Sequence, residues 1–439
     1  MPEPRIRPRD REAILQSLTA GVVPRRGQQH IQVGRALEVS AVIEDLDRIV
    51  DGGSAVRFVI GEYGAGKSFF LQLVRAIALE KNLVAMHADL TPDRRLHATG
   101  GQARTLYAEL TRNLATRTNP EGGALASVVE RFITSALQNA KAADRPVQEL
   151  IDQRLAGLAE MVGGYDFAAV IAAYWRGHDE GDAALKDSAV RWLRGEYSTK
   201  TDARRDLGVR AIVDDANVYD HFKLFARFVV LAGYGGLLIG LDEMVNLYKL
   251  ANTTARRSNY EQILRIVNDC LQGGVEHLGF LMGGTPEFLT DTRRGLYSYE
   301  ALQSRLAENA FATGGLRDLS GPVIRLQSLS QEELFVLLQR LRHVQASGDE
   351  ARYLIPDSGL EAFMRHCSGR LGDDYFRTPR TTIKAFLQLL AVVEQNADAD
   401  WQSLLGEVPV EVDRGAEADL VPREGPGATD DEELTSFRL

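Results

Sequence analysis

The sequence predicts an α/β protein in which a parallel sheet carries a long helical insertion and is followed by a C-terminal helical lid. Residues 56–60 and 83–89 are apolar runs typical of buried strands, and residues 67–80 between them repeat apolar side chains at helical spacing. Strand, helix and strand within ~35 residues form a βαβ unit, whose strands must pair in parallel. Only helical patterns follow over residues 100–232, before an apolar run resumes at 237.

Composition supports a multidomain protein with a real core. The chain has 439 residues, 44% of them hydrophobic, which predicts two or three domains. Much of the net charge of −10 lies in residues 407–439, where ten Asp and Glu face three Arg, whereas residues 1–35 hold seven Arg against three acids. The two cysteines, Cys270 and Cys367, form no disulfide framework or zinc motif. No long apolar run or secretory leader is visible, so we expect a cytoplasmic protein without a membrane span.

These patterns divide the chain into five expected parts. They are an Arg-rich N-terminal segment (1–30), an ATPase core (31–99 and 233–329), a helical insertion (100–232), a helical lid (330–400) and an acidic, disordered tail (410–439).

The remaining elements are justified by periodicity and by their ends. Besides 67–80, the expected helices are 11–20, 36–50, 103–117, 124–143, 147–161, 166–176, 182–194, 218–232, 259–272, 357–368 and 379–396. The later strands are expected at 237–241, 278–282 and 323–326. Ser330 and Glu333 form a capping-box pattern that begins the first lid helix, and Thr378-Pro379 is a cap and first-turn proline for the last one.

The strongest functional motif follows the first strand. It fits the full phosphate-binding pattern of two glycines, a lysine and a serine, placed between an apolar strand and an amphipathic helix. Backbone amides and the helix N-terminus bind phosphates, Lys67 reaches the β- and γ-phosphates, and Ser68 ligates Mg²⁺. The expected ATP-binding residues are Gly61, Glu62, Tyr63, Gly64, Ala65, Gly66, Lys67, Ser68 and Phe69.

A second motif ends the third strand. Leu237–Asp242 is apolar up to Asp242, which is followed by Glu243, so both carboxylates fall at the carboxyl edge of a parallel sheet. Asp242 is expected to hold Mg²⁺ together with Ser68, and Glu243 to act as the general base toward water. The adjacent Asp-Glu pair favours an ATP-hydrolysing machine over a small-molecule kinase. Alone, however, an Asp-Glu pair after a buried strand is also common in proteins without this chemistry.

Three further side chains are weaker candidates. Thr285, after the fourth strand, would sense the γ-phosphate, or else serve only as a cap before Pro286. Arg380, in the first turn of the last lid helix, would reach back to the phosphates, or else be a solvated arginine. Arg35, after Gly34, would form the adenine-side wall, or else a salt-bridged turn.

An arginine finger for a neighbouring subunit is expected between the fourth and fifth strands. Arg305 is the first candidate for it, with Arg293 and Arg294 as rivals, and the alternative is a surface helix arginine. The pairs Arg94-Arg95 and Arg256-Arg257 are expected in loops, where they would contact nucleic acid or simply face solvent.

Taken together, these residues resemble those of the AAA+ class and its additional-strand relatives, the Orc/Cdc6-like and STAND ATPases. Five stretches carry a closer likeness, to the BREX-system ATP-binding protein family of BrxD type from bacterial phage-defence loci. The likeness spans about residues 5–400 and implies a role in antiphage defence beside a helicase-like partner. The five stretches begin at Gly61, Asp89, Gly100, Gly240 and Arg377.

The expected function is therefore ATP hydrolysis with Mg²⁺, acting on DNA or on a DNA-processing partner, in a chain that forms homo-oligomers. The alternative is a slow ATP-dependent switch or scaffold that recruits an effector without acting on DNA. A third reading, a motor that moves along DNA by itself, has no separate helicase motif set in its favour.

Overall fold

The computed structural model describes residues 6–312, 317–371, 379–396 and 398–407. Within these residues, five strands form a parallel sheet in the order β2-β3-β4-β1-β5, which confirms the predicted α/β fold with its P-loop-type core. The additional strand β4 separates the P-loop strand β1 from β3, the strand that carries Asp242. The strands are β1 (Ser54–Gly61), β2 (Val84–Asp89), β3 (Leu237–Asp242), β4 (Leu278–Gly284) and β5 (Val323–Leu326).

Because the strands are parallel, their carboxyl ends meet at one edge of the sheet. The register places Ile60 beside Gly284 and Asp89 beside Asp242 at that edge. Strands β2, β3 and β4 lie on one side of β1, and β5 lies on the other. Ligands of open α/β sheets bind beyond the carboxyl ends of the strands, at the point where successive connections leave in opposite directions. The topology therefore gathers the two acidic strand ends and the P-loop at one place.

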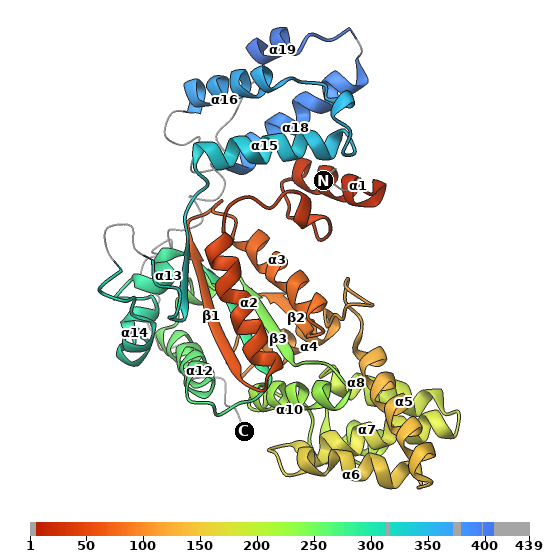
Figure 1. Ribbon diagram of the computed structural model, residues 1–439. Helices are drawn as coiled ribbons and strands as arrows, with labels where there is room; N and C mark the ends of the chain where they lie inside the picture. The colour runs from red at the N-terminus through yellow and green to blue at the C-terminus, as the bar shows by residue number, and fades with distance from the viewer. Residues whose placement is uncertain (1–5, 313–316, 372–378, 397, 408–439) are drawn as a thin grey trace, which may run out of the picture.

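The two faces of the sheet are covered differently (Figure 1). Helices α2 (Ala36–Val50) and α3 (Lys67–Glu80) cover one face through a compact cluster that includes Val59 and Val74. The opposite face packs against α12 (Thr253–Leu271) and the insertion through a much larger apolar cluster. Both faces of the sheet are thus covered by packed helices, and the edge formed by the carboxyl ends of the strands carries the P-loop.

The helical insertion shares the core of the larger face. Phe222 and Phe280 pack edge-on, which joins helix α10 to strand β4. The sequence patterns missed α9, because its residues are mostly polar and only Ala203 and Leu207 are buried; its one signal was the Thr199 cap. The insertion helices are α4 (Gln102–Arg112), α5 (Leu125–Ala143), α6 (Val147–Ala159), α7 (Gly164–Asp179), α8 (Ala183–Leu193), α9 (Lys200–Leu207) and α10 (Val218–Leu231).

The lid has a core of its own, and the N-terminal helix α1 (Pro8–Thr19) belongs to it. Helix α1 lies beside the lid helices (Figure 1), and Ile14 of α1 is buried in the same cluster as Leu338 and Phe386 of the lid. The predicted capping box of Ser330 and Glu333 is confirmed. The lid helices are α15 (Gln331–Gln345), α16 (Asp357–Leu371), α18 (Pro379–Gln395) and α19 (Trp401–Glu407).

Short helices complete the described chain. They are η1 (Gln28–His30), α11 (Val245–Tyr248), α13 (Pro286–Thr290), η2 (Leu296–Ser298), α14 (Glu300–Leu306) and η3 (Glu350–Arg352). No helix in the described ranges combines the length and apolarity needed to span a membrane. The expected cap Thr378 and the acidic tail at 410–439 lie outside the described residues, so the five-part division of the chain stays a prediction.

One expectation about a basic pair is wrong. Arg256 and Arg257 lie inside α12 rather than in a loop, because the Asn252 side chain accepts a hydrogen bond from the Ala255 amide and begins the helix six residues before the predicted start. The guanidinium of Arg256 is buried and donates to the carbonyl of Leu250 at 2.7 Å. Arg256 therefore serves the fold and presents no solvent-facing charge to a nucleic acid.

Candidate functional site

The P-loop connects the end of β1 to the start of α3 through two glycines in the left-handed region. Gly64 has φ 82° and Gly66 has φ 85°, values that L side chains rarely adopt. A Cβ at Gly66 would meet nothing within 4 Å, so backbone conformation rather than crowding demands glycine there. The start of α3 lines the cavity described below, and a helix N-terminus, whose first amides lack partners within the helix, favours an anion there.

Lys67 folds back onto its own loop. Its Nζ donates to the carbonyls of Gly61 at 2.8 Å and Glu62 at 2.9 Å. Burial lowers the pKa of the Lys67 ammonium, and the nearby carboxylates of Asp242 and Glu243 oppose that shift. The ammonium is therefore partly desolvated and held by weak neutral acceptors, from which a phosphate group can withdraw it.

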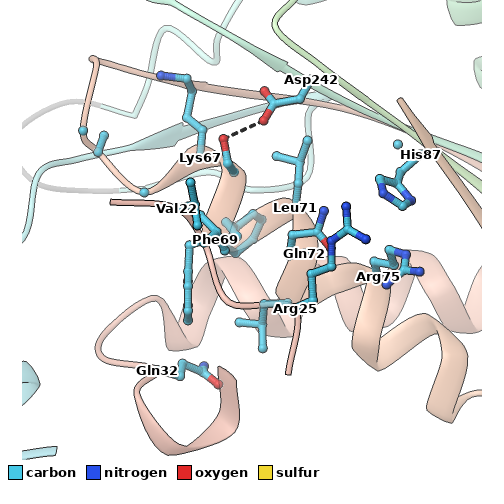
Figure 2. A pocket seen from close by; sticks show the side chains of 18 of the residues that line it. Val22, Arg25, Gln32, Lys67, Phe69, Leu71, Gln72, Arg75, His87 and Asp242 are labelled. Carbon is cyan, nitrogen blue, oxygen red and sulfur yellow. Dashed lines mark hydrogen bonds between the residues drawn. The ribbon is translucent and has the colours of Figure 1, made fainter. Parts of the chain in front are cut away.

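Ser68 and Asp242 meet across the sheet edge. The Ser68 hydroxyl donates to Oδ2 of Asp242 at 2.6 Å, the dashed contact in Figure 2. A hydroxyl and a carboxylate oxygen held this close, beside the open start of α3, fit the ligands that Mg²⁺ takes next to phosphate oxygens. The residues present thus suit the expected ion.

Gly283 of β4 makes this arrangement possible, and sequence reasoning missed it. A Cβ at Gly283 would lie 2.4 Å from Oδ1 of Asp242, too close for any side chain. The only signal in the sequence was the Gly283-Gly284 pair at the end of a predicted strand, which reads equally well as a simple strand terminus.

Glu243 sits in a strained conformation directly after β3. Its φ of 57° is unusual for a residue with a side chain, and its amide donates to Oδ1 of Asp242 at 2.8 Å. Burial raises the pKa of the Glu243 carboxyl, and the charges of Asp242 and Asp89 add to the rise. Asp89, whose own pKa is raised by burial and by Asp242, is a second residue that the motif search missed, because it follows its strand alone.

A cavity of about 550 Å³ extends from the P-loop between the N-terminal segment, α3 and the lid. Residues 63–70 line it, as do Asp242 and Glu243, whereas Gly61 and Glu62 lie behind and bind Lys67 through their carbonyls. One part of the wall is apolar, as a nucleoside base requires. Apolar residues of this part are Val22, Ile31, Val33, Phe69, Leu329, Leu337 and Ile383.

Arg35 lines the same cavity and holds two backbone segments together. Its guanidinium donates to the carbonyl of Ala65 at 3.1 Å and to that of Gln327. Burial lowers the pKa of Arg35. The arginine thus fixes the P-loop against the segment that leads into the lid, close to the apolar wall.

Arg380 brings the lid to the P-loop. Its NH1 donates to the hydroxyl of Tyr63 at 2.8 Å, and its guanidinium lies against Gly21, where a Cβ would come within 2.8 Å of Nε. Glycine suits position 21 because it has no side chain that would clash with the guanidinium. Its φ of 73° is also a value that L side chains rarely adopt. Lid, N-terminal segment and P-loop therefore meet at one side chain.

Thr285 and the arginine-finger candidates do not line the cavity. Thr285 is buried and caps α13 by accepting from the Phe288 amide at 3.4 Å. Arg305 donates to Asn268 at 2.5 Å and to the Ala301 carbonyl at 2.8 Å, so a finger role would require it to leave these partners. Its rival Arg294 donates to the carbonyls of Tyr248 and Leu250, whereas the Arg293 side chain is exposed.

Comparison with known families agrees with this geometry. The family model for the BREX system ATP-binding protein BrxC/D matches residues 6–409. Among curated proteins, the sequence has no significant match. The match spans the P-loop, the Asp242–Glu243 strand end and the lid, and the chain accordingly belongs to the BREX system ATP-binding protein BrxC/D family.

Proposed function

We propose that this ATP-binding protein of BREX phage defence hydrolyses ATP, and that the contact between Ser68 and Asp242 with Glu243 beside it carries the reaction. ATP would place its phosphates on the amides of residues 64–68 and its base against the apolar wall. Lys67 would exchange its two carbonyl acceptors for phosphate oxygens, which offer far more negative charge. Mg²⁺, held by Ser68 and Asp242, would neutralise the charge that develops on the phosphates.

Glu243 is the proposed general base. It follows Asp242 directly, and its backbone is fixed by the hydrogen bond to that residue. Its raised pKa moves the carboxylate toward the range in which it accepts a proton from water effectively. Thr285 and an arginine from a neighbouring copy, Arg305 first, remain proposed contributors on the γ-phosphate side.

Hydrolysis would drive movement of the lid. Arg380 contacts Tyr63 inside the P-loop, so a nucleotide that displaces Tyr63 or attracts Arg380 would shift α18. We propose that this movement acts on DNA or on a helicase-like partner in the cytoplasm. The same contact supports the alternative, a slow switch whose lid position alone recruits an effector.

The test is steady-state ATP turnover by the purified chain, alone and with single- or double-stranded DNA, with Lys67→Ala as the blank. Turnover that rises with DNA supports action on nucleic acid. Turnover that is slow and indifferent to DNA supports the switch, and turnover equal to the blank in every condition contradicts hydrolysis altogether.

A further inference from the structure

The cavity does not end at the nucleotide site but continues along α3 to a group of cationic residues. Gln72 and Arg75 follow Ser68 at intervals of four and three residues, so they lie on the same face of the helix. His87 of β2 and Arg25 of the N-terminal segment complete the group, and Figure 2 shows these four side chains turned toward one another. We call Arg25, Gln72, Arg75 and His87 the cationic end of the cavity.

Arg75 is the buried centre of the cationic end. It is only 8% exposed, yet its Nε has no hydrogen-bond partner among the described residues. Its NH2 donates to the carbonyl of Pro120, which fixes the plane of the guanidinium. Nδ1 of His87 is likewise buried without a partner in the described chain. Buried polar nitrogens of this kind normally find hydrogen-bond partners, and leaving them unpaired costs free energy.

Nearby carboxylates act on the positive charge here without forming an ion pair with it: Asp89 lines the same cavity, where the charge of Arg25 favours its ionised form. Within the described ranges, neither Arg25 nor Arg75 forms an ion pair. Glu121, the carboxylate that most affects Arg75, is paired with Arg26 at 2.6 Å. Burial lowers the pKa of Arg75, and the charge of Arg25 lowers it further. Burial and the two arginines also hold the pKa of His87 at about 4, which leaves the imidazole neutral.

We propose that the cationic end is a second anion site, separate from the P-loop, that binds one phosphate-class dianion. Two guanidinium groups match a tetrahedral phosphate, because each presents parallel N–H donors to pairs of oxygens. The Gln72 amide and the neutral His87 ring add donors of the kind that orient such a ligand. The anion also relieves the repulsion between Arg25 and Arg75, which no ion pair in the described chain now neutralises. This site goes beyond ATP hydrolysis and does not depend on it.

Two sources supply that chemistry: free orthophosphate, including the product of ATP hydrolysis, and the phosphomonoester group of a separate small molecule. The shared features are a double negative charge and three or four acceptor oxygens. A site for free phosphate encloses every oxygen, whereas a site for a monoester leaves room for a substituent. Binding of phenyl phosphate distinguishes the two.

The test is calorimetric titration of the full chain, with its P-loop saturated by ADP and Mg²⁺, using orthophosphate and then phenyl phosphate. We expect saturable binding of at least one of them that weakens about tenfold or more in Arg75→Gln and in Arg25→Gln, as loss of a charged hydrogen bond predicts. Arg112→Gln, an exposed arginine paired with Glu109 away from the cavity, should bind as the wild type does. Binding should also persist in Lys67→Ala without nucleotide.

Thermal unfolding of each variant keeps the result decisive. Because Arg75 is buried, its replacement can weaken the fold. If thermal unfolding shows that Arg75→Gln is destabilised, the phosphate affinity of Arg25→Gln, which replaces an exposed residue, tests the proposal by itself. Binding of orthophosphate only identifies the free ion as ligand, and binding of phenyl phosphate as well identifies a monoester. Absence of saturable binding, or binding lost in Lys67→Ala but retained in Arg25→Gln, overturns the proposal.

Discussion

The P-loop end and the cationic end of the cavity differ in how their charges are partnered. At the P-loop end, Lys67 donates to two carbonyls, and Asp242 accepts from both Ser68 and the Glu243 amide. At the cationic end, Arg75 and His87 have buried nitrogens without partners in the described chain. The first site is pre-organised by hydrogen bonds among its own residues, whereas the second is assembled by the packing of three distant segments and leaves nitrogens unpaired. Substitutions at each end should therefore act differently.

The largest expected effect is the loss of ATP affinity in Lys67→Ala. Without the ammonium, the phosphates lose a charged donor in a partly desolvated site, and we expect Kd for ATP to rise roughly 100-fold. Fluorescent-nucleotide titration measures it. Lys141→Ala, an exposed lysine near the end of α5, is the matched control. Unchanged affinity in Lys67→Ala would show that ATP binds elsewhere.

A second substitution separates geometry from charge at the P-loop end. Gly283→Ala places a methyl group against Oδ1 of Asp242, which must shift. We expect ATP turnover to fall roughly 10- to 100-fold, because moving a catalytic group such as the Asp242 carboxylate by about 1 Å can slow a reaction that much. The affinity for ATP should change far less. Gly157→Ala on α6, whose Cβ meets nothing within 4 Å, is the control. Wild-type turnover in Gly283→Ala would contradict the assigned role of Asp242.

The lid contact should have a smaller, shared effect. Tyr63→Phe and Arg380→Gln each remove the same hydrogen bond. Because that bond is exposed, it contributes no more than about 1.5 kcal/mol to the stability of the lid contact. We expect each to change KM for ATP by roughly 2- to 10-fold, and the double variant to differ little from the single ones. Lys384→Gln, exposed on the same helix, is the control. Fully additive effects would show that Tyr63 and Arg380 act independently.

The last effect concerns pH and the cationic end, and it appears in stability rather than in nucleotide binding or turnover. The pKa of His87 is about 4 in the folded chain against an ordinary 6.5, so between these values only the unfolded chain takes up the proton. Stability is therefore lost as pH falls from 6.5 toward 4. In His87→Gln this loss is absent, and Tm should fall less between about pH 7 and pH 5 than in the wild type. If Tm falls as much in His87→Gln as in the wild type, the burial of a neutral His87 is contradicted. The same holds if His178→Gln, which replaces an exposed histidine, reduces the fall of Tm equally.

Sequence reasoning located elements correctly where a feature is encoded in a short contiguous run. The P-loop, the strand ending in Asp242 and the Ser330 capping box are local patterns, and the structure places each on the predicted element. It failed where a residue matters through distant neighbours. Gly283 is defined by its contact with Asp242, and the proposed role of Arg75 arises only when β2 and the N-terminal segment pack on α3. No spacing in the sequence encodes such contacts.

The central claim is that Glu243 activates water for ATP hydrolysis at a site assembled by Ser68 and Asp242. The most direct measurement is single-turnover ATP hydrolysis by Glu243→Gln, with ATP affinity measured on the same sample. Loss of a general base predicts a rate about 10²- to 10⁴-fold lower, with affinity close to that of the wild type. A near-normal rate in Glu243→Gln would contradict the claim and place the base on another residue.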